Sequence, residues 1–179
     1  MAQREIVVAG NPVLRQKSIK IRNFGASIED LVTDMLDTMR SADGLGLAAP
    51  QIGVPLRLIV IETQPADDDE GNATEPSALY VYCNPEIVES SGEEEADEGC
   101  LSVPGYVGAV TRATSVTVKG QDARGRKVRT KAEGLLARAF QHEIDHLNGT
   151  LFIDRVDSPE KLRPTGSENQ ESERDTTLQ

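Results

Sequence analysis

Apolar and polar positions along the chain predict two long helices. Between residues 27 and 43 apolar side chains recur every three or four positions, which is the spacing of one buried helical face. Ser27 is expected to cap the start of this helix, and Gly44 follows its end. A second helix is predicted from Lys131 to Gly149. Apolar residues cover most of its circumference, so it should be largely buried.

Short apolar runs between these helices predict β-strands. Leu56–Ile61 and Leu79–Cys83 are such runs, and the second is expected to stop at Asn84 and Pro85. Residues 107–119 are rich in Val and Thr, which favour strands. Turn-forming residues follow at 121–127, and a return strand is expected from Val128.

Two polar stretches are predicted to lie outside the folded core. Residues 64–77 are acidic and interrupted by Pro and Gly, which indicates a surface loop to which we assign no function. The tail from 164 to 179 contains almost no apolar residue and is expected to be disordered and dispensable. A chain of 179 residues is long enough for one domain with a real core, so residues 1–163 are predicted to form it.

Charge and composition argue against several classes of protein: those that bind nucleic acid, span a membrane, are secreted or depend on disulfides. The formal net charge is −11, which argues against a surface for nucleic-acid phosphates and against direct DNA binding. No apolar run approaches the ~20 residues that span a bilayer, and the N-terminus lacks the apolar core of a secretory signal. Two cysteines, Cys83 and Cys100, are too few for a disulfide scaffold. We therefore expect a cytoplasmic location.

The second helix carries a candidate metal-binding motif. Within it, His142, Glu143 and His146 form the motif His-Glu-x-x-His. His142 and His146 are the only two histidines in the chain. Residues four apart lie on one face of a helix, so both imidazoles can point at one metal ion. Glu143 can then reach a water on that ion.

A catalytic metal usually has three protein ligands and one open position, so a third ligand is needed. Cys83 lies inside an apolar run, where a thiol is typically inert. Cys100 follows Gly99 and would complete a Cys-His-His site. A downstream acid, Asp154 or Glu160, would instead give a site of two histidines and one carboxylate.

These residues predict a metal-dependent amide hydrolase. Metal coordination lowers the pKa of water to about 7, and Glu143 would act as general base. Gln51 is a candidate donor to the oxyanion that forms. Two alternatives remain at this point: a metallo-endopeptidase with the same motif, and a non-catalytic binding module held together by its metal.

Three separated motifs resemble the peptide deformylase family in order and spacing. They are Gly44-Leu45-Gly46-Leu47-Ala48-Ala49-Pro50-Gln51, Glu98-Gly99-Cys100-Leu101-Ser102 and Gln141-His142-Glu143-x-x-His146. The resemblance covers about residues 6–156. It implies an α+β fold with antiparallel β-sheets packed around a central metal-binding helix. It also implies that the chain removes the N-formyl group from the formylmethionine of new polypeptides and releases formate.

Position by position, the resemblance implies roles for individual residues. Three would bind one divalent ion, most often Fe²⁺ in this family, with Zn²⁺, Ni²⁺ or Co²⁺ as substitutes: Cys100, His142 and His146. Glu143 would be the general base, and Gln51 and the backbone N–H of Leu101 would donate to the oxyanion. The substrate would contact Gly46 through its backbone and Leu45, Leu135 and Ala139 through its methionine side chain.

Two further features qualify the resemblance. Arg138 stands where some members have an apolar pocket residue, and its head group is expected to reach solvent while its stem packs. The family's ribosome contact would be transient and would use the basic residues around the 121–127 turn: Lys119, Arg124, Arg126, Lys127, Arg129 and Lys131. A solvated hairpin is the simpler interpretation of this charge. The protein is expected to be a monomer.

Overall fold

The computed structural model describes residues 3–67 and 73–165 of the chain. It contains two α-helices, α1 (Ala26–Ser41) and α2 (Gly134–Leu147), among the described residues. The main sheet has the order β1-β2-β5-β8-β9 and is antiparallel throughout. Its strands are β1 (Gly46–Ala48), β2 (Leu58–Glu62), β5 (Leu79–Ser91), β8 (Ser115–Gln121) and β9 (Lys127–Glu133).

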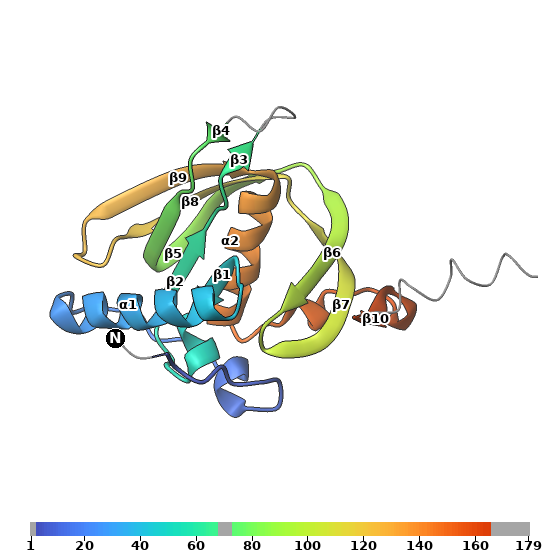
Figure 1. Ribbon diagram of the computed structural model, residues 1–179, viewed down its shortest axis with the longest axis horizontal. Coiled ribbons are helices and arrows are strands. Elements are labelled where there is room, and N and C mark those ends of the chain that lie inside the picture. The colour runs from blue at the N-terminus through green and yellow to red at the C-terminus, as the bar shows by residue number, and fades with distance from the viewer. Residues whose placement is uncertain (1–2, 68–72, 166–179) are drawn as a thin grey trace, which may run out of the picture.

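A second antiparallel sheet has the order β10-β7-β6. Its strands are β6 (Glu94–Cys100), β7 (Val103–Arg112) and β10 (Leu162–Pro164). A small ribbon pairs β3 (Ala66–Asp67) with β4 (Ala73–Glu75). Short 3₁₀ turns complete the fold: Pro12–Arg15, Ala49–Ile52, Phe152–Asp154 and Pro159–Lys161. In Figure 1, α2 runs through the centre between the main sheet and the β6–β7 hairpin, as the predicted α+β fold requires.

The two helices pack on opposite faces of the main sheet, and the alternating side chains of β2 contact both of them. Side chains alternate between the two faces of a strand. Ile59 and Ile61 belong to the cluster that contains Phe140 of α2, while Leu58 and Val60 belong to the cluster of α1. The continuous apolar run that predicted this strand is therefore buried on both faces.

The aromatic core fixes α2 on the sheet. Phe140 is fully buried, and Tyr80 and Tyr82 of β5 meet its ring edge-on, with centroids 5.7 and 5.2 Å away. Edge-to-face pairs of this kind add about 0.5–1.5 kcal/mol beyond simple burial. Because Phe140 lies two residues before His142, this packing also holds the metal-binding motif in place.

Several predicted boundaries are wrong. Helix α1 begins at Ala26 with Gly25 as its cap, so Ser27 lies inside the helix. Residues 127–133 pair with β8 as strand β9, and α2 begins only at Gly134, whose φ is +56°. Glycine adopts this left-handed conformation without strain, which lets the chain turn from strand to helix.

Strand β5 is also longer than predicted. It continues past Asn84 and Pro85 to Ser91, because a register shift between Cys83 and Glu86 accommodates the proline and Asn84 takes a positive φ of 53°. Of the predicted 64–77 loop, residues 68–72 lie outside the described residues, as does the tail from 166 onwards. Pro164, expected in the tail, pairs with Tyr106 as part of β10. No helix in the described part of the chain is long and apolar enough to cross a membrane.

Candidate metal centre

Helix α2 places both histidines on one face, toward β6. The ring centroids of His142 and His146 are 5.0 Å apart and their Nε2 atoms 3.3 Å apart. Cys100, the last residue of β6, brings its Sγ to 3.3 Å from Nε2 of His146. One ligand atom from each of the three residues lies within 4.8 Å of the others.

These three side chains fit a divalent metal ion. Two nitrogens each about 2.0–2.1 Å from a tetrahedral ion lie about 3.4 Å apart, close to the separation of the two rings. A thiolate with two imidazoles is a donor set that iron, nickel, cobalt and zinc accept. Of the alternative third ligands, Asp154 is engaged by Arg15 and the N–H of Leu151, and neither it nor Glu160 belongs to the cluster.

Glu98 orients the first histidine. Its Oε2 lies 2.9 Å from Nδ1 of His142, which leaves Nε2 of the ring facing Cys100 and His146. Burial opposes ionisation of Glu98, but hydrogen bonds from Arg112 and His142 outweigh it and lower its pKa to about 2. A carboxylate on the far ring nitrogen fixes the ring and raises its basicity as a ligand.

The pKa values of the two histidines are shifted in opposite directions. Burial opposes a positive charge on the His142 ring, yet its hydrogen bonds to Cys100 and Glu98 outweigh burial and raise its pKa to about 10. For His146 burial lowers the pKa, so this ring is neutral and able to act as a ligand.

Arg138 is buried, contrary to our expectation that its head group reaches solvent. Its Nη1 donates to Oε1 of Glu98 at 2.9 Å and to the carbonyl of Val110 at 2.8 Å, and its Nη2 donates to the carbonyl of Glu94. Only 10% of its side chain is exposed. The sequence could not reveal this, because the partner carboxylate lies forty positions away within an acidic run.

A second buried arginine extends the network away from the histidines. Arg112 forms two hydrogen bonds with Glu98 through Nε and Nη2 and contacts Asp145 at 2.6 Å through Nη1. Arg155 donates to both carboxylate oxygens of Asp145. Two carboxylates and three arginines therefore stabilise one another behind the histidines, where unpaired charges would be costly.

Glu143 points into the space beside the histidines. It is 5% exposed, and burial raises its pKa to about 7. Its Oε2 has no hydrogen-bond partner among the described residues. A carboxyl group with this pKa can take up and release a proton near neutral pH.

Gly46 of β1 lies directly against Glu143. A Cβ built on Gly46 would be 2.6 Å from Oε1 of Glu143 and 3.0 Å from its Cγ and Cδ. Because glycine has no side chain, β1 can approach this catalytic candidate closely.

Gln51 is held beside Cys100. Its Oε1 accepts a hydrogen bond from the N–H of Ala48 at 2.9 Å, which turns its Nε2 toward Sγ of Cys100 at 3.6 Å and Oγ of Ser102 at 3.2 Å. Leu101 lines the same pocket. The roles of both residues as oxyanion donors stay predictions.

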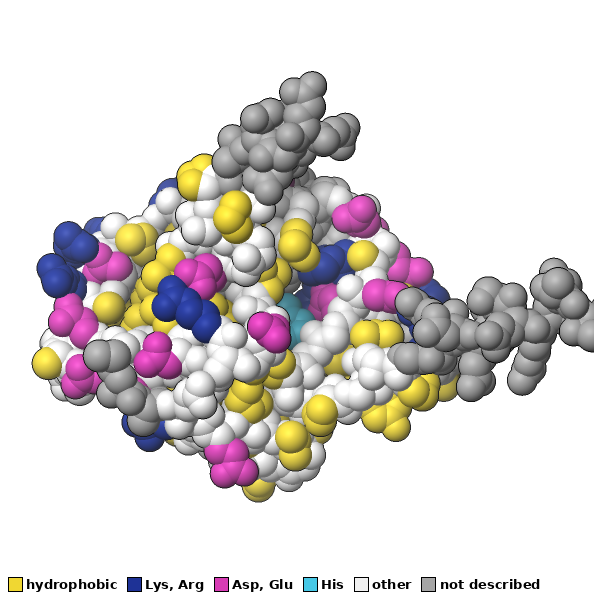
Figure 2. Space-filling model, in the orientation of Figure 1, with side chains coloured by type: hydrophobic (Ala, Val, Ile, Leu, Met, Phe, Trp, Pro, Cys, Tyr) yellow, Lys and Arg dark blue, Asp and Glu magenta, His cyan; other side chains and the backbone are white. Residues whose placement is uncertain are grey.

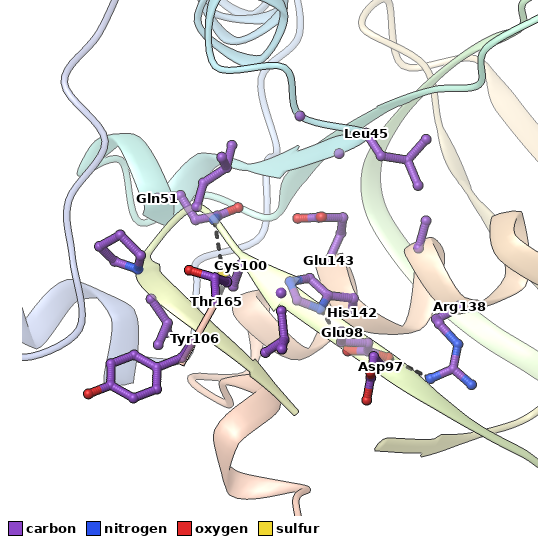
Figure 3. Close-up of a pocket in the computed structure, with 18 of the residues that line it drawn as sticks. Leu45, Gln51, Asp97, Glu98, Cys100, Tyr106, Arg138, His142, Glu143 and Thr165 are labelled. Atoms are coloured by element: carbon purple, nitrogen blue, oxygen red, sulfur yellow. Dashed lines mark hydrogen bonds and ion pairs between the residues drawn. The ribbon is translucent and has the colours of Figure 1, made fainter. Parts of the chain in front are cut away.

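The pocket in front of these groups has a volume of 500 Å³. Figure 2 shows it as a hollow with a histidine at its floor. In Figure 3, Gln51, Cys100, His142 and Glu143 converge, while Leu45 lies on the β1 side and Arg138 pairs with Glu98 behind. The substrate-binding candidates Gly46, Leu45, Leu135 and Ala139 all line this pocket.

Cys83, the second thiol, is fully buried in the α1 cluster, and burial raises its pKa to about 12. It lies outside the metal cluster, as predicted.

A family model described as polypeptide deformylase matches residues 3–162. The chain belongs to the peptide deformylase family. A peptide deformylase of Thermomicrobium roseum is 49% identical over 96% of both chains, and one of Dehalococcoides mccartyi (strain CBDB1) is 45% identical over 95% of this chain and 96% of its own.

Solved peptide deformylase structures share the fold. A peptide deformylase from Legionella pneumophila is 49% identical, covers 89% of both chains and superposes with a TM-score of 0.78. A peptide deformylase from Synechococcus elongatus, crystallised with actinonin, is 40% identical with a TM-score of 0.77, over 88% of this chain and 81% of its own. The predicted family and fold class are thus confirmed.

Sequence reasoning missed the network that supports the deformylase motifs. Glu98 was quoted in the second motif but given no role, and Arg112 was not singled out. One signal was present: Glu98 precedes Cys100 by two positions, which puts both side chains on one face of a strand. No local signal marks Arg112.

Proposed function

We propose that this chain hydrolyses the formyl amide at the N-terminal formylmethionine of newly made polypeptides and releases formate. The convergence of Cys100, His142 and His146 beside a buried Glu143 is the observation that carries the proposal. Membership of the peptide deformylase family supports the same activity.

Cys100, His142 and His146 would hold one divalent ion, and we propose Fe²⁺, with Zn²⁺, Ni²⁺ or Co²⁺ as substitutes. When bound, such an ion supplies Lewis acidity for the attack of water on the formyl carbonyl. Glu98 holds Nδ1 of the His142 ring, which leaves Nε2 turned toward Cys100 and His146 and free to act as a ligand.

Glu143 moves the proton in this proposal. With a pKa of about 7, its carboxylate form takes a proton from the attacking water and its acid form returns the proton to the leaving amine. Gln51 Nε2 and the N–H of Leu101 would donate to the oxyanion as the formyl carbon becomes tetrahedral. Loss of one such donor typically lowers the rate by about 10²–10³-fold.

The substrate would align along β1. This strand lies at the edge of the main sheet, so one side of its backbone, including Gly46, pairs with no other strand of the described residues. An extended peptide can bind such an edge through main-chain hydrogen bonds. The methionine side chain would enter the apolar pocket between Leu45, Leu135 and Ala139, because Leu135 is 67% exposed and offers its surface to a ligand.

Formate release from formyl-Met-Ala-Ser, with protein prepared without oxygen, tests the proposal. Oxygen must be excluded because a thiolate ligand is readily oxidised. Acetyl-Met-Ala-Ser is the matched control substrate, and we expect no acetate from it. The variant Glu143→Ala should fold and bind metal but release almost no formate. Full turnover by this variant would refute the proton-transfer role.

Cys100→Ser tests the ligand set. We expect it to lose or change its metal content together with its activity. Unchanged metal content would favour a site of two histidines and a carboxylate, as in a metallo-endopeptidase.

We also propose the setting in which the enzyme works. It would act as a monomer in the cytoplasm on nascent chains, in transient contact with the ribosome. Residues 1–163 would form the catalytic domain, and removal of residues 164–179 should leave formate release unchanged. A truncated protein that lost activity would contradict this boundary.

A further inference from the structure

Arg138 lies on the face of α2 that lines the pocket of the metal centre. Four residues of this helix line the pocket: Leu135, Arg138, Ala139 and His142. They are spaced three or four positions apart, so their side chains share one side of the helix. Leu135 and Ala139 belong to the proposed methionine pocket and His142 to the metal site. Arg138 is the member of this face that has no role in the proposed reaction.

The guanidinium group of Arg138 is held at its far end by three acceptors. It donates to Glu98 and to the carbonyl of Glu94 in β6, and to the carbonyl of Val110 in β7. One side chain thus ties α2 to both strands of the β6–β7 hairpin. The bond to the carboxylate is charge-assisted and therefore among the stronger hydrogen bonds. A long side chain that is fixed in this way cannot move aside for a ligand, so it forms a rigid part of the pocket wall.

Arg138 also lies at the end of the pocket away from the metal ligands. It precedes His142 by one helical turn, which is about 6 Å along the axis of α2. In Figure 3 it lies beyond His142 as seen from Cys100, and its guanidinium group extends toward Glu98. A substrate with its formyl carbonyl at the metal ligands and its first side chain against Ala139 would therefore point that side chain toward Arg138.

We propose that Arg138 is a specificity-determining residue that closes the inner end of the methionine pocket and limits the length of the first side chain. This inference rests on the proposed function, because it concerns the substrate of that reaction. A shorter residue at position 138 opens space beyond Ala139, where a longer side chain can be buried.

The role of Arg138 can be separated from the orientation of the metal ligand. Arg112 donates to both carboxylate oxygens of Glu98, through Nε to Oε1 and through Nη2 to Oε2. When Arg138 is replaced, Glu98 keeps this counter-charge and its contact with Nδ1 of His142. The accepted side-chain length can therefore change while the metal site is retained.

The test uses two formylated tripeptides whose first side chains differ only in length. Formyl-norleucyl-Ala-Ser carries a straight alkyl chain about as long as the methionine side chain. Formyl-2-aminooctanoyl-Ala-Ser is longer by two methylene groups. The measured quantity is the ratio of kcat/KM for the longer substrate to kcat/KM for the shorter one. Loss of metal or a general weakening of the site lowers both values and leaves this ratio unchanged.

Arg138→Ala should raise the ratio at least about tenfold, which is the lower end of what one methylene group contributes in an apolar pocket. Arg138→Gln is shorter than arginine but can still donate a hydrogen bond. It should raise the ratio by a smaller factor, and it provides the test if the alanine variant does not fold. A folded variant with the parent ratio, or with a lower one, would overturn the proposal.

Arg155→Ala is the matched control. Arg155 belongs to the same network of carboxylates and arginines through Asp145, but it does not line the pocket of the metal centre. This variant should keep the parent ratio. A rise equal to that of Arg138→Ala would assign the effect to the network and overturn the role of Arg138 as the end wall.

Formate release from formyl-Met-Ala-Ser by the parent protein separates the two proposals. If the parent released no formate, the proposed function would fail, and this inference with it. If the parent released formate but the ratio did not depend on Arg138, only the present inference would fail.

Discussion

Substitution of Gly46 by Ala tests how closely the catalytic candidate is positioned. The added Cβ would lie 2.6 Å from Oε1 of Glu143, whereas ordinary contacts begin at 3.4 Å. The carboxylate must therefore retreat by about 0.8 Å, unless β1 itself moves. The φ of Gly46 is not in the left-handed region, so alanine can adopt the backbone and the effect is steric.

A misplacement of about 1 Å can cost on the order of 10²-fold in rate. We expect Gly46→Ala to lower kcat by about this factor while metal content stays at the parent level. Overpacking a well-filled site also costs about 1–3 kcal/mol, so the melting temperature should fall moderately.

The assay is formate release with metal content measured on the same sample. Gly99→Ala is the matched control, because a Cβ there meets nothing closer than 3.7 Å. It should retain most of its activity. A Gly46→Ala protein with parent kcat, or with a raised KM alone, would refute the contact with Glu143 as the reason for glycine at this position.

Three further outcomes are expected. Phe140→Ala should destabilise the fold by about 3–5 kcal/mol in chemical denaturation, because a fully buried ring leaves a cavity under α2; a loss below 1 kcal/mol would be inconsistent with this packing. Glu98→Gln should weaken metal binding by about 10–100-fold in a chelator competition, and unchanged affinity would contradict its role in orienting His142. Iodoacetamide at pH 8 should leave Cys83 unmodified in the native protein, because its pKa of about 12 keeps it a thiol and a thiol is a poor nucleophile; mass spectrometry that found it alkylated would contradict its burial.

Local patterns in the sequence were sufficient to predict much of the fold. The apolar run at residues 58–61 and the helical spacing around Met35 each reflect burial of that segment against its neighbours. The spacing of His142 and His146 fixes their common face on α2 without any tertiary contact. Such features depend on residues close together in the chain.

The features that were predicted wrongly depend on distant partners. Residues 131–133 have a composition that suits a helix, but pairing with β8 keeps them in β9. Arg138 was expected to reach solvent, and its burial depends on Glu98 and on the carbonyls of Glu94 and Val110 in strands β6 and β7. None of these partners can be identified from spacing along one sequence.

The central claim is that one sulfur and two imidazoles hold the metal, and X-ray absorption at the metal edge tests it most directly. Protein purified without oxygen should show one sulfur at about 2.3 Å with two nitrogen neighbours, and Cys100→Ser should lose the sulfur. A spectrum with only nitrogen and oxygen neighbours in the parent protein would contradict the account.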